Sequence, residues 1–227
     1  MRQPLETSLV AEDGVSAASL ALAFEELLGG GSALLPLLQP HAQRLASLIK
    51  GLTLHPVAQL LLTAAQTARP EHYAHAVAAM ALNGALMVAG GGDDAAVRLA
   101  LLCGLLHDVG EMYIGPEHGE AEADRDLDFA SYQQLVVHPH VGSLLLAQLT
   151  NYPADVARAV AEHHERLDQS GYPNALAGRQ MSTQGRLLAV TEATLHALRS
   201  PYSHLLHASV ALRAVPGEFD LVWVGKI

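Results

Sequence analysis

The sequence predicts an all-α protein. Ala and Leu dominate the composition, β-branched residues are sparse outside short stretches, and apolar residues recur at helical spacing rather than in strand-like alternation. Clusters of Gly and Pro divide the chain into segments of helical length. Hydrophobic residues make up 50% of the 227 positions, which is enough for one domain with a sizeable core, or for one domain with a helical extension.

Composition also narrows the function. The formal net charge is −10 and the two lysines are Lys50 and Lys226, so we expect no groove for DNA or RNA, which needs clustered positive charge. Cys103 is the single cysteine, so we expect no internal disulfide and a reducing, cytoplasmic environment. No apolar run is long enough to span a membrane. The 13 histidines make bound metal ions the natural source of positive charge for an anionic ligand.

Residues 1–66 are predicted to form a helical extension or linker. An amphipathic stretch at 17–28 is closed by three glycines, and prolines punctuate two further short helices before residue 67. The segment carries no recognisable motif. It either packs against the bundle that follows or joins a partner domain.

A longer helix is expected to begin at Pro70, where proline suits the first helical position. Glu71 and His75 are four residues apart and share a face of this helix, while His72 shares that face through its i,i+3 relation to His75. On spacing alone, a solvated Glu–His pair and a pair of metal ligands both remain open, with His72 as a spare candidate.

The next helix should follow the glycines at 90–92, capped by Asp93 or Asp94, and run through apolar residues to His107. Burial of adjacent ionisable residues, His107 and Asp108, is costly unless something compensates for it. Metal coordination would do so, because imidazole and carboxylate suit iron, manganese or zinc. Asp108 could then bridge two ions.

Two further histidine motifs are expected at helix ends. His138 opens a helix with Pro139 behind it, and His140 faces elsewhere, towards solvent or outside the ligand set. A later helix delivers His163 and His164 at its last turn, where one histidine would stabilise the helix end electrostatically. That role does not account for two histidines, so a metal site is the stronger interpretation.

The remaining pattern consists of a turn and a helix. Residues 168–173 bend the chain and contain Gly and Pro ahead of a helix predicted at 185–200, which carries the acid Glu192. The closing segment is expected to pack on the bundle through Phe219, Leu221, Val222 and Trp223.

Together, five motifs in a fixed order over roughly residues 70–225 resemble the HD-GYP family, metal-dependent phosphodiesterases of cyclic di-GMP within the HD phosphohydrolases. The motifs are an early histidine, the run GLLHDVGE, the run HPHVG, the run HHERLDQSGYP and a late acid. The resemblance implies an HD-domain helical bundle over 67–227.

The resemblance also implies a set of metal ligands for two or three divalent ions, with iron or manganese favoured and zinc, nickel or magnesium possible. The implied ligands are Glu71, His75, His107, Asp108, His138, His163, His164 and Glu192. His107 and Asp108 would be catalytic, through a metal-bridging hydroxide that attacks the phosphodiester. Tyr172 would lie against the cleft for a cyclic dinucleotide.

Several substrate-side positions depart from the family pattern. The family lysine expected to contact phosphate is Glu111, a glycine of the GYP turn is Gln169, and the late acid is Glu192 where Asp is usual. The arginine-rich segment is reduced so that Arg199 is its candidate substitute for contact with substrate.

Three functions therefore stay open. The first is a cyclic di-GMP phosphodiesterase. The second is a metal-binding but catalytically weak regulatory domain that acts through a signalling-protein partner, and the third is a phosphohydrolase of another nucleotide. A homodimer is compatible with each of them.

Overall fold

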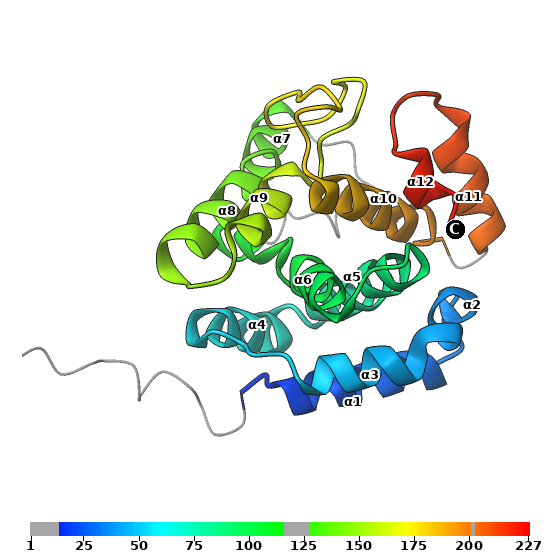
Figure 1. Cartoon of the computed structure of the whole chain (residues 1–227). Helices are drawn as coiled ribbons and strands as arrows, with labels where there is room; N and C mark the ends of the chain where they lie inside the picture. Colours follow the sequence, from blue (N-terminus) through cyan, green and yellow to red (C-terminus); the bar gives the residue numbers. More distant parts are fainter. Residues whose placement is uncertain (1–13, 116–127, 201–202) are drawn as a thin grey trace, which may run out of the picture.

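A computed structural model describes residues 14–115, 128–200 and 203–227 (Figure 1). The prediction of an all-α protein is confirmed, and an isolated bridge joins Asp168 to Ala177. The helices are α1 (Ala17–Gly29), α2 (Leu35–Leu38), α3 (Ala42–Lys50), α4 (Pro56–Ala68), α5 (Pro70–Ala89), α6 (Asp94–Leu106), α7 (Phe129–Leu135), α8 (His138–Leu149), α9 (Ala154–Glu162), α10 (Thr183–Ala197), α11 (Leu205–Ala214) and α12 (Leu221–Val224), with 3-10 turns η2 (Gln39–His41) and η3 (Val109–Tyr113).

The paired helices α5 and α6 form the centre of the bundle, and their ends confirm the predicted signals. Pro70 opens α5, and Gly91 follows it with a positive φ of 86°. The Asp93 side chain accepts the backbone N–H of Ala96 at 2.8 Å and so caps α6. The two backbones approach closely at Gly104, where an added Cβ would lie 2.5 Å from a carbonyl oxygen of α5.

The N-terminal helices cover one face of this central pair. In Figure 1, α1 and α3 form a layer below α5 and α6, with α4 beside them, and all of these helices share one hydrophobic cluster. The predicted helix at 17–28 is confirmed as α1. The boundary at residue 66 stays a prediction, and α4 runs continuously across it.

On the opposite face, α8, α9 and α10 form a further layer (Figure 1). A buried polar chain joins α5, α6 and α10: the Asn83 amide donates to the Ala100 carbonyl at 2.7 Å, and the Thr191 hydroxyl donates to the Asn83 side-chain oxygen at 2.8 Å. Buried polar groups that are fully hydrogen-bonded in this way specify one arrangement of the helices they join.

The C-terminal segment closes one side of the bundle. Phe219 and Trp223 are buried, as expected, and Trp223 packs against Gly90 at the end of α5. The expectation is wrong for Leu221 and Val222, which are 71% and 65% exposed, because a helix as short as α12 buries one side and presents the other to solvent. Among the described residues, no helix is both long and apolar enough to cross a bilayer.

Candidate metal centre

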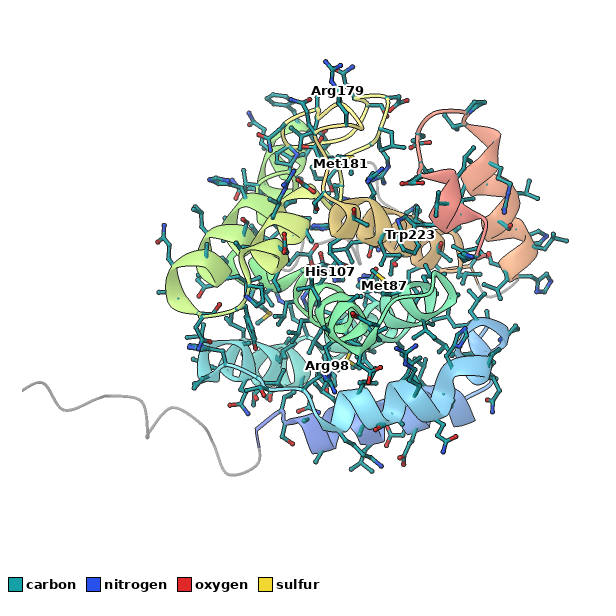
Figure 2. The ribbon with its side chains drawn as sticks, in the orientation of Figure 1. Met87, Arg98, His107, Arg179, Met181 and Trp223 are labelled. Atoms are coloured by element: carbon teal, nitrogen blue, oxygen red, sulfur yellow. The ribbon has the colours of Figure 1, made fainter. Side chains whose placement is uncertain are left out.

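Residues far apart in the sequence meet between the central pair and the α8–α10 layer, where Figure 2 places His107 near the middle of the molecule. His75 comes from α5, His107 and Asp108 follow α6, and Glu192 comes from α10. His138 opens α8, and His163 and His164 follow α9. The described residues form three groups with the geometry to hold a metal ion: Asp108, His138, His163 and His164; His75, His107 and Glu192; and His72, Asp108 and Glu111.

Three of the imidazole rings are oriented by the backbone. In each, Nδ1 lies 2.6 to 2.8 Å from the carbonyl oxygen three residues earlier; the pairs are His107 with Gly104, His138 with Leu135, and His163 with Val160. A carbonyl only accepts, so Nδ1 must carry the proton. The Nε2 lone pair of the neutral ring is then directed into the centre, which is how a metal-binding histidine is prepared.

The first group gathers around one oxygen of Asp108. Its Oδ1 lies 3.4 Å from Nε2 of His138 and 3.3 Å from Nε2 of His163, and those two nitrogens are 3.1 Å apart. All of the residues in the group are buried. The lone pairs of these two nitrogens repel each other at this distance, and a cation bound between them would remove that repulsion.

The second group gathers around the other oxygen of Asp108. Oδ2 lies 3.0 Å from Nε2 of His107 and 3.6 Å from Nε2 of His75. Glu192 Oε2 lies 2.9 Å from Nε2 of His75 and 3.1 Å from Nε2 of His107. Each oxygen of Asp108 therefore faces a different group, and the longer side chain of Glu192 reaches the centre from α10.

The charges of the acids are set by these histidines. Burial opposes ionisation of Asp108, but the neighbouring His107 holds the pKa of that carboxyl well below its usual range. Burial likewise opposes ionisation of Glu192, and His75 with His107 lowers its pKa well below the usual value. In return, although burial disfavours the charged rings, Glu192 raises the pKa of His75, and Asp108 raises that of His107 well above its usual value.

Within the first group, the rings of His163 and His164 are neutral at pH 7. Burial, together with the adjacent His164, lowers the pKa of His163 to about 3. Burial and the His138 ring lower the pKa of His164 well below its usual value. The ionised acids retain buried oxygens without a hydrogen-bond donor among the described residues, at Asp108 Oδ1 and Glu192 Oε1. Neutral nitrogens and unsatisfied anionic oxygens fit divalent metal ions.

The third group contains a residue expected to face the substrate. Glu111 is buried in η3, and its Oε2 lies 3.2 Å from Nδ1 of His72. Glu71, the ligand that the resemblance implies, is exposed and joins none of the groups found among the described residues. Glu71 and His72 lie four and three residues before His75, so either could share its face of α5. The packing at the start of α5 turns His72 inwards and Glu71 outwards.

The GYP turn supports the first group from outside. The Tyr172 ring stacks on His164, with centroids 4.5 Å apart and 17° between the planes. Glu165 is fully buried and accepts the backbone N–H groups of Asn174 at 2.7 Å and Leu176 at 2.8 Å, which ties the turn to the end of α9. Gln169 adopts a φ of 72°, so it takes the left-handed conformation that glycine adopts more easily.

A cavity of about 350 Å³ adjoins the centre. His164, Tyr172 and Glu192 line it on the metal side, and His196 and Phe219 line it farther away. Sequence reasoning missed Arg166, which also lines the cavity. Its guanidinium lies 3.3 Å from Glu218 and 4.8 Å from the Phe219 ring centroid, and its place two residues after the double histidine was the available signal.

Arg199, the predicted substitute for the family arginine, lies just beyond the end of α10. It is not among the described residues that line this cavity. His140 is exposed, as expected, and Cys103 is a buried free thiol in the core.

Comparison with known proteins identifies the family and the fold. A family model described as an HD domain matches residues 35–218. The chain is 35% identical over 187 residues to the cyclic di-GMP phosphodiesterase PA4108 of Pseudomonas aeruginosa, and the match covers 79% of this chain and 44% of that protein. It is 32% identical over 97 residues to the cyclic di-GMP phosphodiesterase response regulator RpfG of Xanthomonas campestris, covering 42% of this chain and 25% of that one.

The chain is also 28% identical over 88 residues to the 3'3'-cGAMP-specific phosphodiesterase 3 of Vibrio cholerae, and this shorter match covers 39% of this chain and 18% of that protein. The chain thus spans less than half the length of the curated relatives it matches. Among solved structures, Bd1817, an HDG"Y"P protein from Bdellovibrio bacteriovorus, has the same fold, with a TM-score of 0.59 and 17% identity over 98% of this chain and 74% of that one.

Proposed function

The chain belongs to the HD domain family, and from that premise we propose that it is a metal-dependent phosphodiesterase that hydrolyses a cyclic dinucleotide, with cyclic di-GMP as the first candidate. The observation that carries the proposal is the position of Asp108, whose two oxygens face two separate sets of nitrogen donors. The names of two relatives as cyclic di-GMP phosphodiesterases support the substrate class.

The proposed ligands divide into two sets that share Asp108. His138, His163 and His164 would hold one ion, and His75, His107 and Glu192 would hold another. Nitrogen and oxygen donors without a thiolate favour iron or manganese, with zinc, nickel or magnesium as alternatives. Such a pair of ions supplies an activated water for attack on phosphorus and positive charge for the phosphate oxygens.

The surrounding residues hold the ligands and receive the nucleotide. Tyr172 fixes the plane of His164, so this ring keeps its orientation as substrate enters. The cavity between Tyr172, His196 and Phe219 has the volume for one part of a nucleotide beside the centre. Arg166 lines the same cavity and brings a guanidinium there, although Glu218 offsets its charge.

Turnover of cyclic di-GMP by protein loaded with iron or manganese without oxygen tests the proposal. We expect hydrolysis that Asp108→Ala abolishes and that His140→Ala leaves unchanged, since His140 is an exposed histidine on the helix that His138 opens. Stoichiometric metal without hydrolysis of cyclic di-GMP would contradict the assignment to this substrate.

A metal-binding regulatory domain with weak catalysis is the second candidate. Two features support it: Glu111 occupies the position where the resemblance implies a lysine, and Arg199 lies outside the described lining of the cavity. Binding of cyclic di-GMP without turnover, or capture of a signalling partner that survives metal removal, would support this candidate. Hydrolysis of a mononucleotide, with the cyclic dinucleotide left intact, would instead assign the chain to another nucleotide.

A further inference from the structure

We propose that the chain carries a second ligand site, a cavity of about 420 Å³ that binds a nucleoside monophosphate. The cavity lies where the connection between α3 and α4 meets α6 and the connection between α8 and α9. Its described lining shares no residue with the metal centre or with the cavity beside that centre. The inference is independent of the proposed activity, since it concerns binding and not turnover.

The position of the cavity separates it from the metal centre. Arg98 lines it from the first half of α6, and His107 follows the end of this helix, about 14 Å farther along its axis. Tyr152 lines it from the α8–α9 connection, whereas His138 and His163 lie at the opposite ends of these two helices. Figure 2 shows Arg98 on the side of the N-terminal helices, away from His107. A phosphate group bound at Arg98 is therefore remote from the metal ligands.

The first argument is the charge of the lining. The chain has 23 acidic residues against 13 Lys and Arg residues, yet the described lining of this cavity contains Arg98 and no carboxylate. The cavity beside the metal centre, by contrast, includes Glu192 and Glu218. Within the described part of the chain, no acid pairs with the guanidinium of Arg98. Its charge and its N–H donors are thus available to an anion.

The second argument is that further hydrogen-bond donors join Arg98 at the cavity. The His55 ring accepts the backbone N–H of Val57 at Nδ1, at 3.2 Å, so in the neutral ring Nε2 carries the proton and can donate it. The Tyr152 hydroxyl accepts the backbone N–H of His55 at 2.7 Å, and its own proton has no acceptor among the described residues. A guanidinium, an imidazole N–H and a phenol O–H suit the ionised oxygens of a phosphate group, which accept.

The rest of the lining fits a nucleoside. Leu54 and Leu102 contribute apolar surface, and the rings of His55 and Tyr152 meet edge to face with centroids 6.3 Å apart. Asn151 brings an amide that both donates and accepts, as the polar edge of a base requires. The volume is in the range of small-molecule sites. Hydrolysis of both phosphodiester bonds of a cyclic dinucleotide releases nucleoside monophosphates, so such a ligand is an end product of the proposed reaction.

The test is calorimetric titration of the Mn²⁺-loaded full chain with GMP. We expect one GMP per chain to bind in Asp108→Ala, which disables the metal centre, because the cavity lies apart from the ions. His163→Ala provides a second background of the same kind, and circular dichroism establishes that each variant is folded. Guanosine, which lacks the phosphate group, should bind at least about tenfold more weakly than GMP.

Arginine variants locate the binding. Arg98→Ala, added to either background, should weaken GMP binding at least about tenfold, because the guanidinium is the charged donor of the cavity. Arg179→Ala is the matched control and should leave the affinity unchanged, since Arg179 is an exposed arginine on the far side of the molecule in Figure 2.

Three outcomes would overturn the inference. GMP binding that Asp108→Ala and His163→Ala both abolish would place the nucleotide at the metal centre. Equal affinity in Arg98→Ala and Arg179→Ala would remove Arg98 from the site, and inorganic phosphate that binds as tightly as GMP would remove the nucleoside. The two proposals fail separately: GMP bound in Asp108→Ala without wild-type hydrolysis of cyclic di-GMP overturns the activity alone, whereas hydrolysis without such binding overturns the second site alone.

Discussion

The two sides of the metal centre hold their histidines in different ways. On the α8–α9 side, backbone carbonyls orient His138 and His163, and His164 stacks on Tyr172. On the α5 side, carboxylates face the rings: Glu192 lies 2.9 Å from His75, and Glu111 lies 3.2 Å from His72. Backbone geometry follows from the fold, whereas a carboxylate partner depends on one residue.

Removal of one ring from each side gives the largest expected effect. His163→Ala should weaken Mn²⁺ binding more than about 100-fold, because a fully buried and pre-oriented donor is lost. His75→Ala should weaken binding only about 10-fold, because its side chain is 21% exposed and water can occupy the position. Metal titration of both variants measures the difference, and equal losses would remove the distinction between the two sides.

The pH dependence of metal binding should separate the same two regions. The raised pKa values of His75 and His107 mean that these rings hold protons in the metal-free protein, and a metal ion must displace them. Because both pKa values lie above the ordinary value of 6.5, affinity at this group should fall as the pH is lowered through neutrality, by at most about tenfold per pH unit for each proton displaced.

The His163 ring behaves differently, because its pKa of about 3 keeps it neutral throughout this range. At about pH 6 the ion beside His75 should therefore leave first, while the ion beside His163 remains. Mn²⁺ titrations at several pH values measure this order, and parallel loss of both ions would contradict it.

A smaller effect is expected from the support behind His164. Tyr172→Ala removes the stacked ring and should reduce metal affinity about tenfold, in the range typical of residues that orient ligands. Tyr172→Phe keeps the ring and is the matched control, which should bind Mn²⁺ as the wild type does. An equal loss in both variants would show that the hydroxyl rather than the stack matters.

The smallest effect is expected at the turn that carries Tyr172. Gln169→Gly should raise the free energy of unfolding by less than about 1 kcal/mol, because the positive φ of 72° strains a side-chain-bearing residue but not glycine. Gln169→Ala should give no gain, since it keeps a Cβ. Urea unfolding of the metal-free forms measures both, and a loss of stability in Gln169→Gly would contradict the argument.

Local signals in the sequence were enough to predict the helices and many of the residues that meet at the metal centre. The glycines after α5 and the cap at Asp93 mark helix ends that depend on neighbouring residues alone. The histidines brought together on the α8–α9 side also follow from such ends, because His163 directly follows the last turn of α9.

Features that depend on how helices rotate against one another were not predictable. By helical spacing alone, either Glu71 or His72 could lie on the inner face of α5. Tertiary packing buries His72 and leaves Glu71 exposed. The partnership of Glu111 with His72 joins η3 to α5, and the position of Arg166 on the cavity depends on Phe219 and Glu218 near the C-terminus. No spacing rule within a single segment encodes these contacts.

The buried amide of Asn83 has a consequence for assembly. It joins α5, α6 and α10; α5 carries His75, α10 carries Glu192, and His107 directly follows α6. A slip of α10 by one residue would strand the Asn83 oxygen and the Thr191 hydroxyl in the apolar interior, at a cost of about 1–3 kcal/mol for each group. The hydrogen bonds of Asn83 thus favour the correct register of these three helices, and they do so without any contribution from a bound ion.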